Sequence, residues 1–110
     1  MKKFDKVLRL MKERNWKEMK GWLHEDFMYL RETALSNREE HVENLKKQFT
    51  EKAAINEPEL LYEDEDMMAF RHLVVQENGK NHRVTQIQLY KDGKVWREIS
   101  NAINSHNKKS

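Results

Sequence analysis

Apolar positions near the start of the chain recur every three or four residues. This spacing places Phe4, Val7, Leu8 and Met11 on one face of a helix that is expected to end near Arg14. In the second half, apolar residues alternate with polar ones, a pattern typical of strands that bury one face. The sequence therefore predicts helices first and strands afterwards, which is the order of an α+β domain.

Two candidate capping boxes mark where further helices begin. In a capping box, an Asn or Ser side chain accepts one free backbone N–H, and a glutamate three residues later accepts another. Asn15 with Glu18 predicts a short second helix, and Ser36 with Glu39 predicts a third one that ends near Lys52. We therefore expect three helices in the first half of the chain.

Five segments have the composition and alternation of strands. They are residues 27–34, 59–63, 67–77, 82–91 and 94–103. The pairs Asn78-Gly79 and Asp92-Gly93 separate the last three segments, and such pairs favour two-residue hairpin turns because their residues accept positive φ angles. The second half is therefore expected to be an antiparallel meander.

A two-residue loop in each hairpin would fix how the strands pair. Glu77 then faces Lys80, and Lys91 faces Lys94. Counting from these pairs gives an inner face with an apolar end and a polar row, made of Met68, Phe70, His72, Val74, Thr85, Ile87, Leu89, Trp96, Glu98 and Ser100. A polar row in an apolar wall predicts a ligand pocket, and the mixed opposite face predicts a protein interface. A one-residue bulge would exchange these faces.

Composition narrows the class of protein. The 110 residues suffice for one core, so we expect a single domain over residues 1–103 and a polar tail over 104–110. The absence of cysteine favours the cytoplasm. A net charge of +2, from 21 basic and 19 acidic residues, provides no general field for nucleic acid. The first twenty residues lack the apolar run of a signal peptide or membrane span, so no membrane partner is expected.

The sequence predicts no metal site and no cofactor. The acidic run 63–66 lacks the alternating ligands and the glycine of a calcium loop. His24-Glu25 has no second histidine four residues later, as a zinc-binding helix would require. A glycine-rich phosphate loop is also missing from the sequence.

The order of elements resembles the SnoaL-like branch of the nuclear transport factor two-like superfamily, which includes ketosteroid isomerase. Residues 22–30 (WLHEDFMYL) are similar to the family's helix end and strand entry, and residues 36–41 (SNREEH) to its third-helix start. The resemblance extends over about residues 4–103. It implies a cone in which a curved sheet wraps around the helices, an apolar cavity open at one end, and homodimers formed through the outer sheet face.

The resemblance does not extend to the chemistry of the isomerase. Such enzymes place a catalytic aspartate on the first strand and a protonated acid in the cavity. Arg31 takes the place of that aspartate and cannot act as a base near neutral pH. Thr85 takes the place of the acid. The isomerase mechanism is therefore not transferred to this chain.

His72 and Glu98 are the candidate catalytic pair. A pocket histidine oriented by a carboxylate can titrate near neutral pH and move a proton. In the alternative interpretation, His72 is a structural residue bonded to Thr85, and Glu98 is paired with Arg31. The sequence leaves both interpretations open.

Tyr29, Arg31, Thr85 and Trp96 are the candidate ligand-binding residues. Arg31 could hold a carboxylate or phosphate through two parallel hydrogen bonds, or it could instead pair internally with Glu98 or with Glu32. Tyr29 and Trp96 could line the apolar part of a ligand or belong to the core.

Three functions remain compatible with the sequence. The first is a dimeric domain that binds a small, partly apolar ligand with an acidic group. The second is a SnoaL-like isomerase, cyclase or hydrolase-type enzyme that uses His72 and Glu98. The third is a protein-interaction module whose cavity is filled by its own side chains.

Overall fold

Three helices and a six-stranded sheet make up the protein in a computed structural model that describes residues 2–49, 54–75 and 81–104. The elements are α1 (Lys2–Glu13), α2 (Trp16–Trp22), β1 (Leu23–Arg31), β2 (Ala34–Asn37), α3 (Arg38–Gln48), β3 (Ala54–Glu63), β4 (Met67–Val75), β5 (Asn81–Lys91) and β6 (Lys94–Asn104). The α+β class predicted from the sequence is confirmed.

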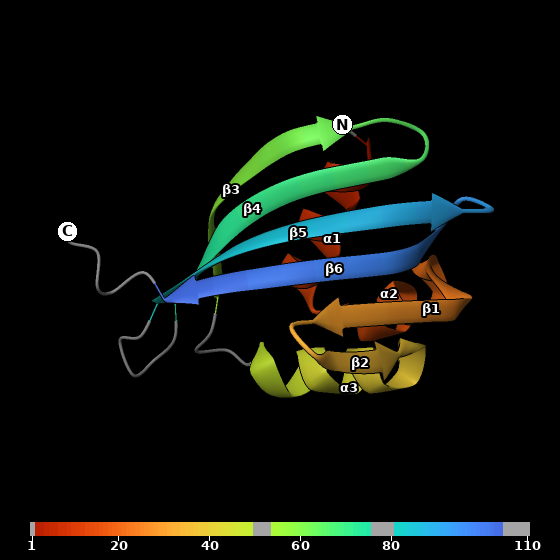
Figure 1. Ribbon diagram of the computed structural model, residues 1–110, viewed down its shortest axis with the longest axis horizontal. Helices are drawn as coiled ribbons and strands as arrows, with labels where there is room; N and C mark the ends of the chain where they lie inside the picture. The colour runs from red at the N-terminus through yellow and green to blue at the C-terminus, as the bar shows by residue number, and fades with distance from the viewer. Residues whose placement is uncertain (1, 50–53, 76–80, 105–110) are drawn as a thin grey trace.

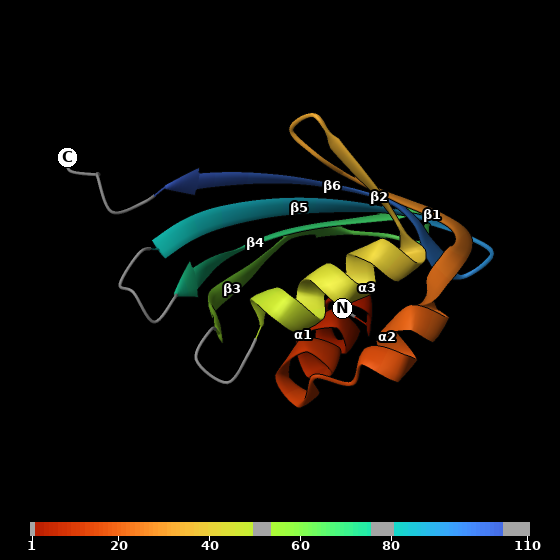
Figure 2. The ribbon, with the colours of Figure 1, turned by 90° about the horizontal axis from the view of Figure 1, so that it is seen from below.

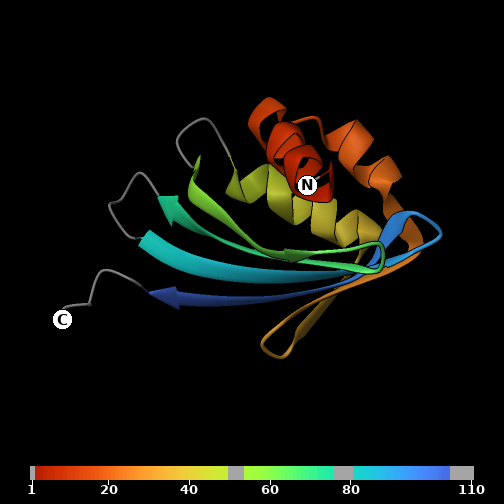
Figure 3. The same cartoon turned by 90° about the horizontal axis from the view of Figure 1, so that it is seen from above.

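The strands form one curved, mixed sheet in the order β2-β1-β6-β5-β4-β3 (Figure 1). β1 and β6 pair in parallel, and the other neighbours are antiparallel. All three helices lie on one face of the sheet, which curves toward them (Figures 2 and 3). The opposite face carries no helix.

The core fills the space between the concave face and the helices. Amphipathic helices bury their apolar stripe in this way because apolar surface is removed from water on both sides of the contact. α1 buries Val7 and Leu10, and the sheet contributes fully buried residues such as Phe27, Phe70 and Met68. The Glu63 side chain accepts the backbone N–H groups of residues 3 and 4, which fixes the start of α1 against β3.

The helix starts differ in detail from the sequence prediction. The capping box of α3 consists of Asn37 and Glu40, one residue after the predicted Ser36 and Glu39. The Asn15 side chain accepts the backbone N–H of Glu18, as predicted, but the Glu18 carboxylate contacts the Asn15 side-chain amide. The box at the start of α3 is therefore shifted by one residue, and the box at the start of α2 is only half formed.

Strand boundaries also differ from the prediction. β1 begins directly after α2, at Leu23, and β2 was not predicted at all. β3 begins at Ala54 and runs through Pro58, which an edge strand tolerates because its missing N–H need not face a neighbour.

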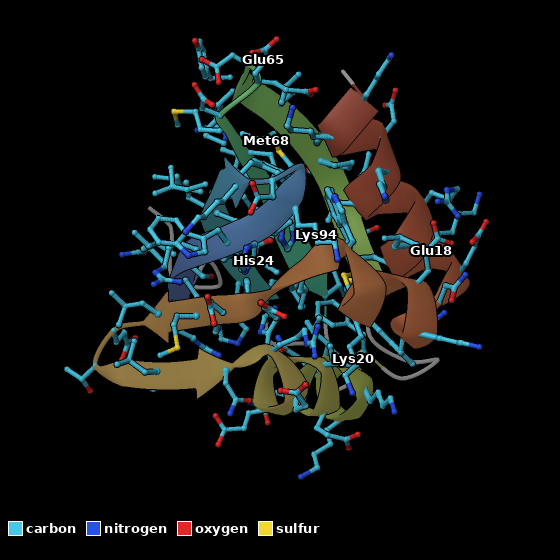
Figure 4. All side chains as sticks on the ribbon, turned by 90° about the vertical axis from the view of Figure 1, so that its right-hand side faces the viewer. Glu18, Lys20, His24, Glu65, Met68 and Lys94 are labelled. Atoms are coloured by element: carbon cyan, nitrogen blue, oxygen red, sulfur yellow. The ribbon has the colours of Figure 1, made fainter. Side chains whose placement is uncertain are left out.

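Glu65, in the β3–β4 turn, and the β1–β2 hairpin mark the two opposite edges of the sheet in Figure 4.

The predicted pairing of the last three strands is partly wrong. Lys91 pairs with Lys94, as predicted, but an extra residue in β6 follows, because Tyr90 faces Val95 whereas Leu89 faces Arg97. The predicted pair of Glu77 and Lys80, and the turn at residues 78–79, lie outside the described residues.

The same hairpin places Val75 opposite Asn81, whereas the predicted loop would place it opposite His82. This difference of one residue turns β5 over. Thr85, Ile87 and Leu89 therefore lie on the outer face, and the inner face of β5 carries Val84, Gln86 and Gln88. The predicted inward residues of β4 and the inward Glu98 and Ser100 of β6 are confirmed.

Candidate functional site

A cavity of about 450 Å³ lies between the concave face of the sheet and the helices. Its polar side chains come mainly from β1, β5 and β6; they include Tyr29, Arg31, Gln86, Gln88, Glu98 and Ser100. Its apolar side chains come mainly from the helices, β3 and β4; they include Val7, Met11, Met19, Leu45, Phe49, Ile55, Phe70 and Val74. The cavity therefore has a polar stretch on β1, β5 and β6 and apolar side chains elsewhere, together with the polar His41, Asn44 and Gln48 of α3; such a mixed lining suits a partly apolar molecule.

A chain of hydrogen bonds runs along the polar stretch, with Glu98 at its centre. The Gln86 side-chain nitrogen donates to Glu98 Oε2 at 2.5 Å, and the Gln88 side-chain nitrogen donates to Oε1 at 3.0 Å. The Tyr90 hydroxyl donates to the Gln88 side-chain oxygen. Each carboxylate oxygen thus has a neutral donor, which is how a buried acid can be accommodated without a cation.

Burial determines the protonation of Glu98, which is only 4% exposed. Loss of hydration disfavours its carboxylate and raises the pKa of Glu98 to about 7, against the lowering effect of the Gln88 and Gln86 hydrogen bonds. Near neutral pH the group can therefore either accept or release a proton.

His72 is joined to Glu98 through Gln86 and not directly. Its Nε2 lies 3.0 Å from the Gln86 side-chain oxygen. Because the Gln86 nitrogen donates to Glu98, its oxygen must accept from His72, which places the proton of the neutral imidazole on Nε2. Burial lowers the pKa of His72, so the ring is neutral near pH 7. Among the described residues, His72 Nδ1 has no hydrogen-bond partner.

The hydrogen-bond partners predicted for His72 and Glu98 from the sequence are wrong. His72 bonds to Gln86 and not to Thr85, and Glu98 is held by two glutamines and not by Arg31. Gln86 and Gln88 were missed because the predicted register turned them outward. The available signal was the alternation of β5, in which Val84, Gln86 and Gln88 share one face whichever way the strand is turned.

Arg31 is exposed and lines the cavity, which places its guanidinium at the rim. No residue in the described part of the chain forms an ion pair with it, so the predicted pairing with Glu98 or Glu32 is not found. Tyr29 also lines the cavity, as does Ser100. Burial raises the pKa of Tyr29, which therefore keeps its proton.

Thr85 and Trp96 do not line the cavity. Thr85 pairs with Arg71 and Asn101 on the outer face. Trp96 is the extra residue of the β6 bulge, and its ring stacks against Arg97, with 3.9 Å between the guanidinium carbon and the ring centroid. If the protein were an interaction module with a filled cavity, Trp96 would be expected to fill it. Its side chain lies outside the cavity.

His41 lines the cavity from α3 but was not a predicted site residue. Its ring centroid lies 4.3 Å from that of Tyr29 and 5.1 Å from that of Phe27. Burial lowers the pKa of His41 to about 4, so it is an uncharged part of the wall near neutral pH. Within the described residues, no group of three or more His, Asp or Glu side chains is placed to hold a metal ion. In the same part of the chain, no helix is long and apolar enough to cross a membrane.

Known structures share this architecture. An NTF2-like protein of unknown function from Cytophaga hutchinsonii superposes with a TM-score of 0.72 and 12% identity, covering 87% of this chain and 82% of that one. The protein has the nuclear transport factor two-like fold. A second such protein of unknown function, from Burkholderia xenovorans, gives a TM-score of 0.72 at 9% identity, covering 94% and 81% of the two chains.

Another structure with the same fold is that of an LEH-like epoxide hydrolase from M. tuberculosis, with a TM-score of 0.65, 10% identity, and coverage of 87% of this chain and 76% of that one. No family model matches the sequence, and no curated protein matches it significantly. At these identities the nuclear transport factor two-like comparison defines the fold, as the sequence resemblance implied, and leaves the ligand to be argued from the cavity.

The raised pKa of Glu98 predicts how stability changes with pH. The folded state binds this proton more tightly than the unfolded chain, so the stabilisation is complete below pH 4.5, the ordinary value, and is lost as pH rises through about 7. The loss is on the order of 3 kcal/mol. Glu98→Gln cannot titrate at this position and does not show this loss. Between pH 5 and pH 8, we therefore expect the wild type to lose about that amount of unfolding free energy relative to the variant.

Urea denaturation of both proteins at the two pH values measures this difference. His41 and His72 lose stabilisation toward acid pH in both proteins, so their contribution cancels when the variant is compared with the wild type. Parallel pH curves for the two proteins would show that Glu98 has an ordinary pKa.

Proposed function

We propose that the protein binds a small, partly apolar molecule with an acidic group, in the cavity between the sheet and the helices. The observation that carries this proposal is a cavity of about 450 Å³ with the Arg31 guanidinium at its rim, which forms no ion pair with any described residue. A cavity of this size falls in the range that holds small ligands. We expect the protein to act in the cytoplasm, since a chain without cysteine needs no oxidising compartment.

The charges around the cavity favour an anion at Arg31. The only carboxylate among the described lining residues is Glu98, which lies deep in the wall and is already held by two amide donors. Arg31 therefore faces an opening without a competing acid. A guanidinium can donate two parallel hydrogen bonds to a carboxylate or phosphate, and Tyr29 and Phe70 are placed to contact the apolar part of the same ligand.

Octanoate and octan-1-ol test this role because they share a tail and differ in the head group. We expect octanoate to bind more tightly than octanol, and Arg31→Gln to weaken octanoate binding by about tenfold or more, the usual effect of losing a charged hydrogen bond. Octanol binding should be unchanged. Isothermal titration calorimetry measures both.

Arg71→Gln is the matched control, because it removes the same charge from the outer face of the sheet. Equal losses of octanoate affinity in the two variants would mean that Arg31 acts only through net charge. Failure of the wild type to bind either molecule would contradict the proposal.

Proton transfer by His72 and Glu98 is a second candidate function. It is favoured by one observation: two titratable side chains joined through Gln86 line the same cavity, and His72 Nδ1 has no partner among the described residues. A neutral imidazole could take a proton from a carbon next to a ligand carbonyl, and a Glu98 near its pKa could exchange protons with the site.

Deuterium exchange into 3-oxooctanoate tests this second candidate. Protons between the two carbonyl groups of this acid are weakly acidic, so a placed base should speed their exchange in heavy water, followed by proton NMR. We expect the wild type to accelerate exchange and His72→Phe to lose the acceleration while still binding octanoate. Equal exchange rates with and without the wild-type protein would leave His72 a structural residue.

We further propose that the protein forms a homodimer through the outer face of the sheet. Cross-strand pairing aligns one apolar row there over all six strands, made of Leu35, Leu30, Ile99, Ile87, Ala69 and Tyr62. Leu35 is 62% exposed, Tyr62 51% and Ile99 44%. The other three residues, Leu30, Ile87 and Ala69, are partly exposed. An apolar row of this kind is typical of a surface that a partner covers, and the family resemblance implies the same face.

Ile99→Glu places a charge at the centre of this row and is expected to convert the dimer to a monomer, measured by light scattering after size exclusion. Gly21→Glu is the control: it adds the same side chain on the helical side, where a Cβ atom would meet nothing within 4 Å. A wild-type protein that is monomeric at all concentrations would contradict the proposal, as would a dimer that tolerates Ile99→Glu.

A further inference from the structure

A second cavity, of about 370 Å³, lies on the other side of the wall that Met11, Phe49 and Ile55 form. These three residues line both cavities. The remaining described lining of the second cavity consists of Leu8, Lys12, Arg14 and Pro58. The two cavities are therefore neighbours that share an entirely apolar partition.

Met11 is the part of the partition that can adapt to a ligand. It is only partly buried, and an unbranched thioether side chain fills irregular space more readily than a branched one. Phe49, by contrast, follows the last residue of α3 and is buried against Val74 and Val84. Its backbone is held separately, because Arg14 Nε donates to the Phe49 carbonyl oxygen at 3.1 Å.

Distance along the sheet sets how long a ligand must be to reach the second cavity. Arg31 lies on β1 and Ile55 on β3, and β6, β5 and β4 separate these strands. Four strand spacings of about 4.8 Å give roughly 19 Å along the curved sheet, and the straight path across its concave side, where the cavities lie, is shorter. A short acid held at Arg31 would therefore remain in the first cavity, whereas a long, unbranched chain would arrive at the partition.

We propose that the second cavity is a subsite for the distal, apolar end of a long-chain acid whose charged end lies at Arg31. This inference rests on the proposed function, because the acid is anchored in the first cavity. It assigns the ligand to the class of extended amphipathic acids. Five of the seven described residues that line the second cavity are apolar. The other two are the cations Lys12 and Arg14, whose alkyl stems can pack against an alkyl chain while their charged ends stay in water.

Saturated acids of different length test the proposal on the full chain. Decanoate should fit within the first cavity and tetradecanoate should reach the second, so we expect tetradecanoate to bind at least about tenfold more tightly, because each buried methylene adds affinity. Leu8→Trp fills the second cavity and should lower tetradecanoate affinity by about tenfold or more, with decanoate affinity unchanged. Calorimetry below the micelle concentration measures both.

Gly21→Trp is the matched variant, because it adds the same side chain at a position that lines neither cavity and where a Cβ atom would meet nothing within 4 Å. It should keep tetradecanoate affinity, which separates filling of the cavity from a general effect of an added tryptophan, and circular dichroism checks that both variants fold. If Leu8→Trp does not fold, Leu8→Phe supplies the same test with a smaller ring. Equal tetradecanoate affinity in the filled variant and the wild type would overturn the subsite.

Arg31→Gln distinguishes failure of the subsite from failure of the proposed function. The variant should weaken decanoate and tetradecanoate by the same factor if both acids anchor at Arg31. Decanoate binding that depends on Arg31, with no effect of Leu8→Trp on tetradecanoate, would remove only the subsite. Tetradecanoate binding that is lost in Lys12→Gln and kept in Arg31→Gln would show the reverse orientation and overturn the inference.

Discussion

The pairing register of β4, β5 and β6 is the constraint on which the cavity depends. Val75 pairs with Asn81, and the bulge at Trp96 adds one residue to β6. Together these two features turn Gln86, Gln88 and Glu98 toward the helices. A slip of one residue in β5 would replace the glutamines by Thr85, Ile87 and Leu89, and Glu98 would be buried without its two amide donors.

The same register produces the two opposite properties of the sheet. On the inner face, it assembles the polar side chains of β5 and β6 opposite the helices and beside the largely apolar inner face of β4. On the outer face, it aligns Leu30, Ile99 and Ile87 with apolar neighbours on the remaining strands. The cavity and the apolar row on the outer face therefore arise from one alternation, because neighbouring residues of a strand point to opposite sides.

Periodicity predicted the elements better than their partners. The helical stripe of α1, the hairpin at Asp92-Gly93 and the inward residues of β4 follow from local spacing, and the structure confirms them. Two further features could not be read from local spacing. The start of α3 moved by one residue because Ser36 and Asn37 are both good capping residues, and the geometry of the β2 end decides between them. The register of β5 depends on how the chain turns before Asn81, which composition alone does not determine.

The candidate site shows the same division. His72, Glu98, Tyr29 and Arg31 were predicted from strand alternation, and all four line the cavity. Thr85 and Trp96 do not line it, and Gln86 and Gln88 were missed. The errors in β5 follow from the one-residue register difference, and the error at Trp96 follows from the bulge. Side-chain type was therefore informative only where the facing direction was already known.

The central feature of the site is that the Glu98 carboxyl group is buried between two amide donors. Titration of its side-chain carboxyl carbon by NMR tests this arrangement most directly. The Glu98→Gln variant assigns the signal. The structure predicts a midpoint near pH 7, raised by burial from the ordinary value of 4.5. A midpoint near 4.5 would mean that water reaches Glu98 and that the inner wall is not the closed, hydrogen-bonded surface described here.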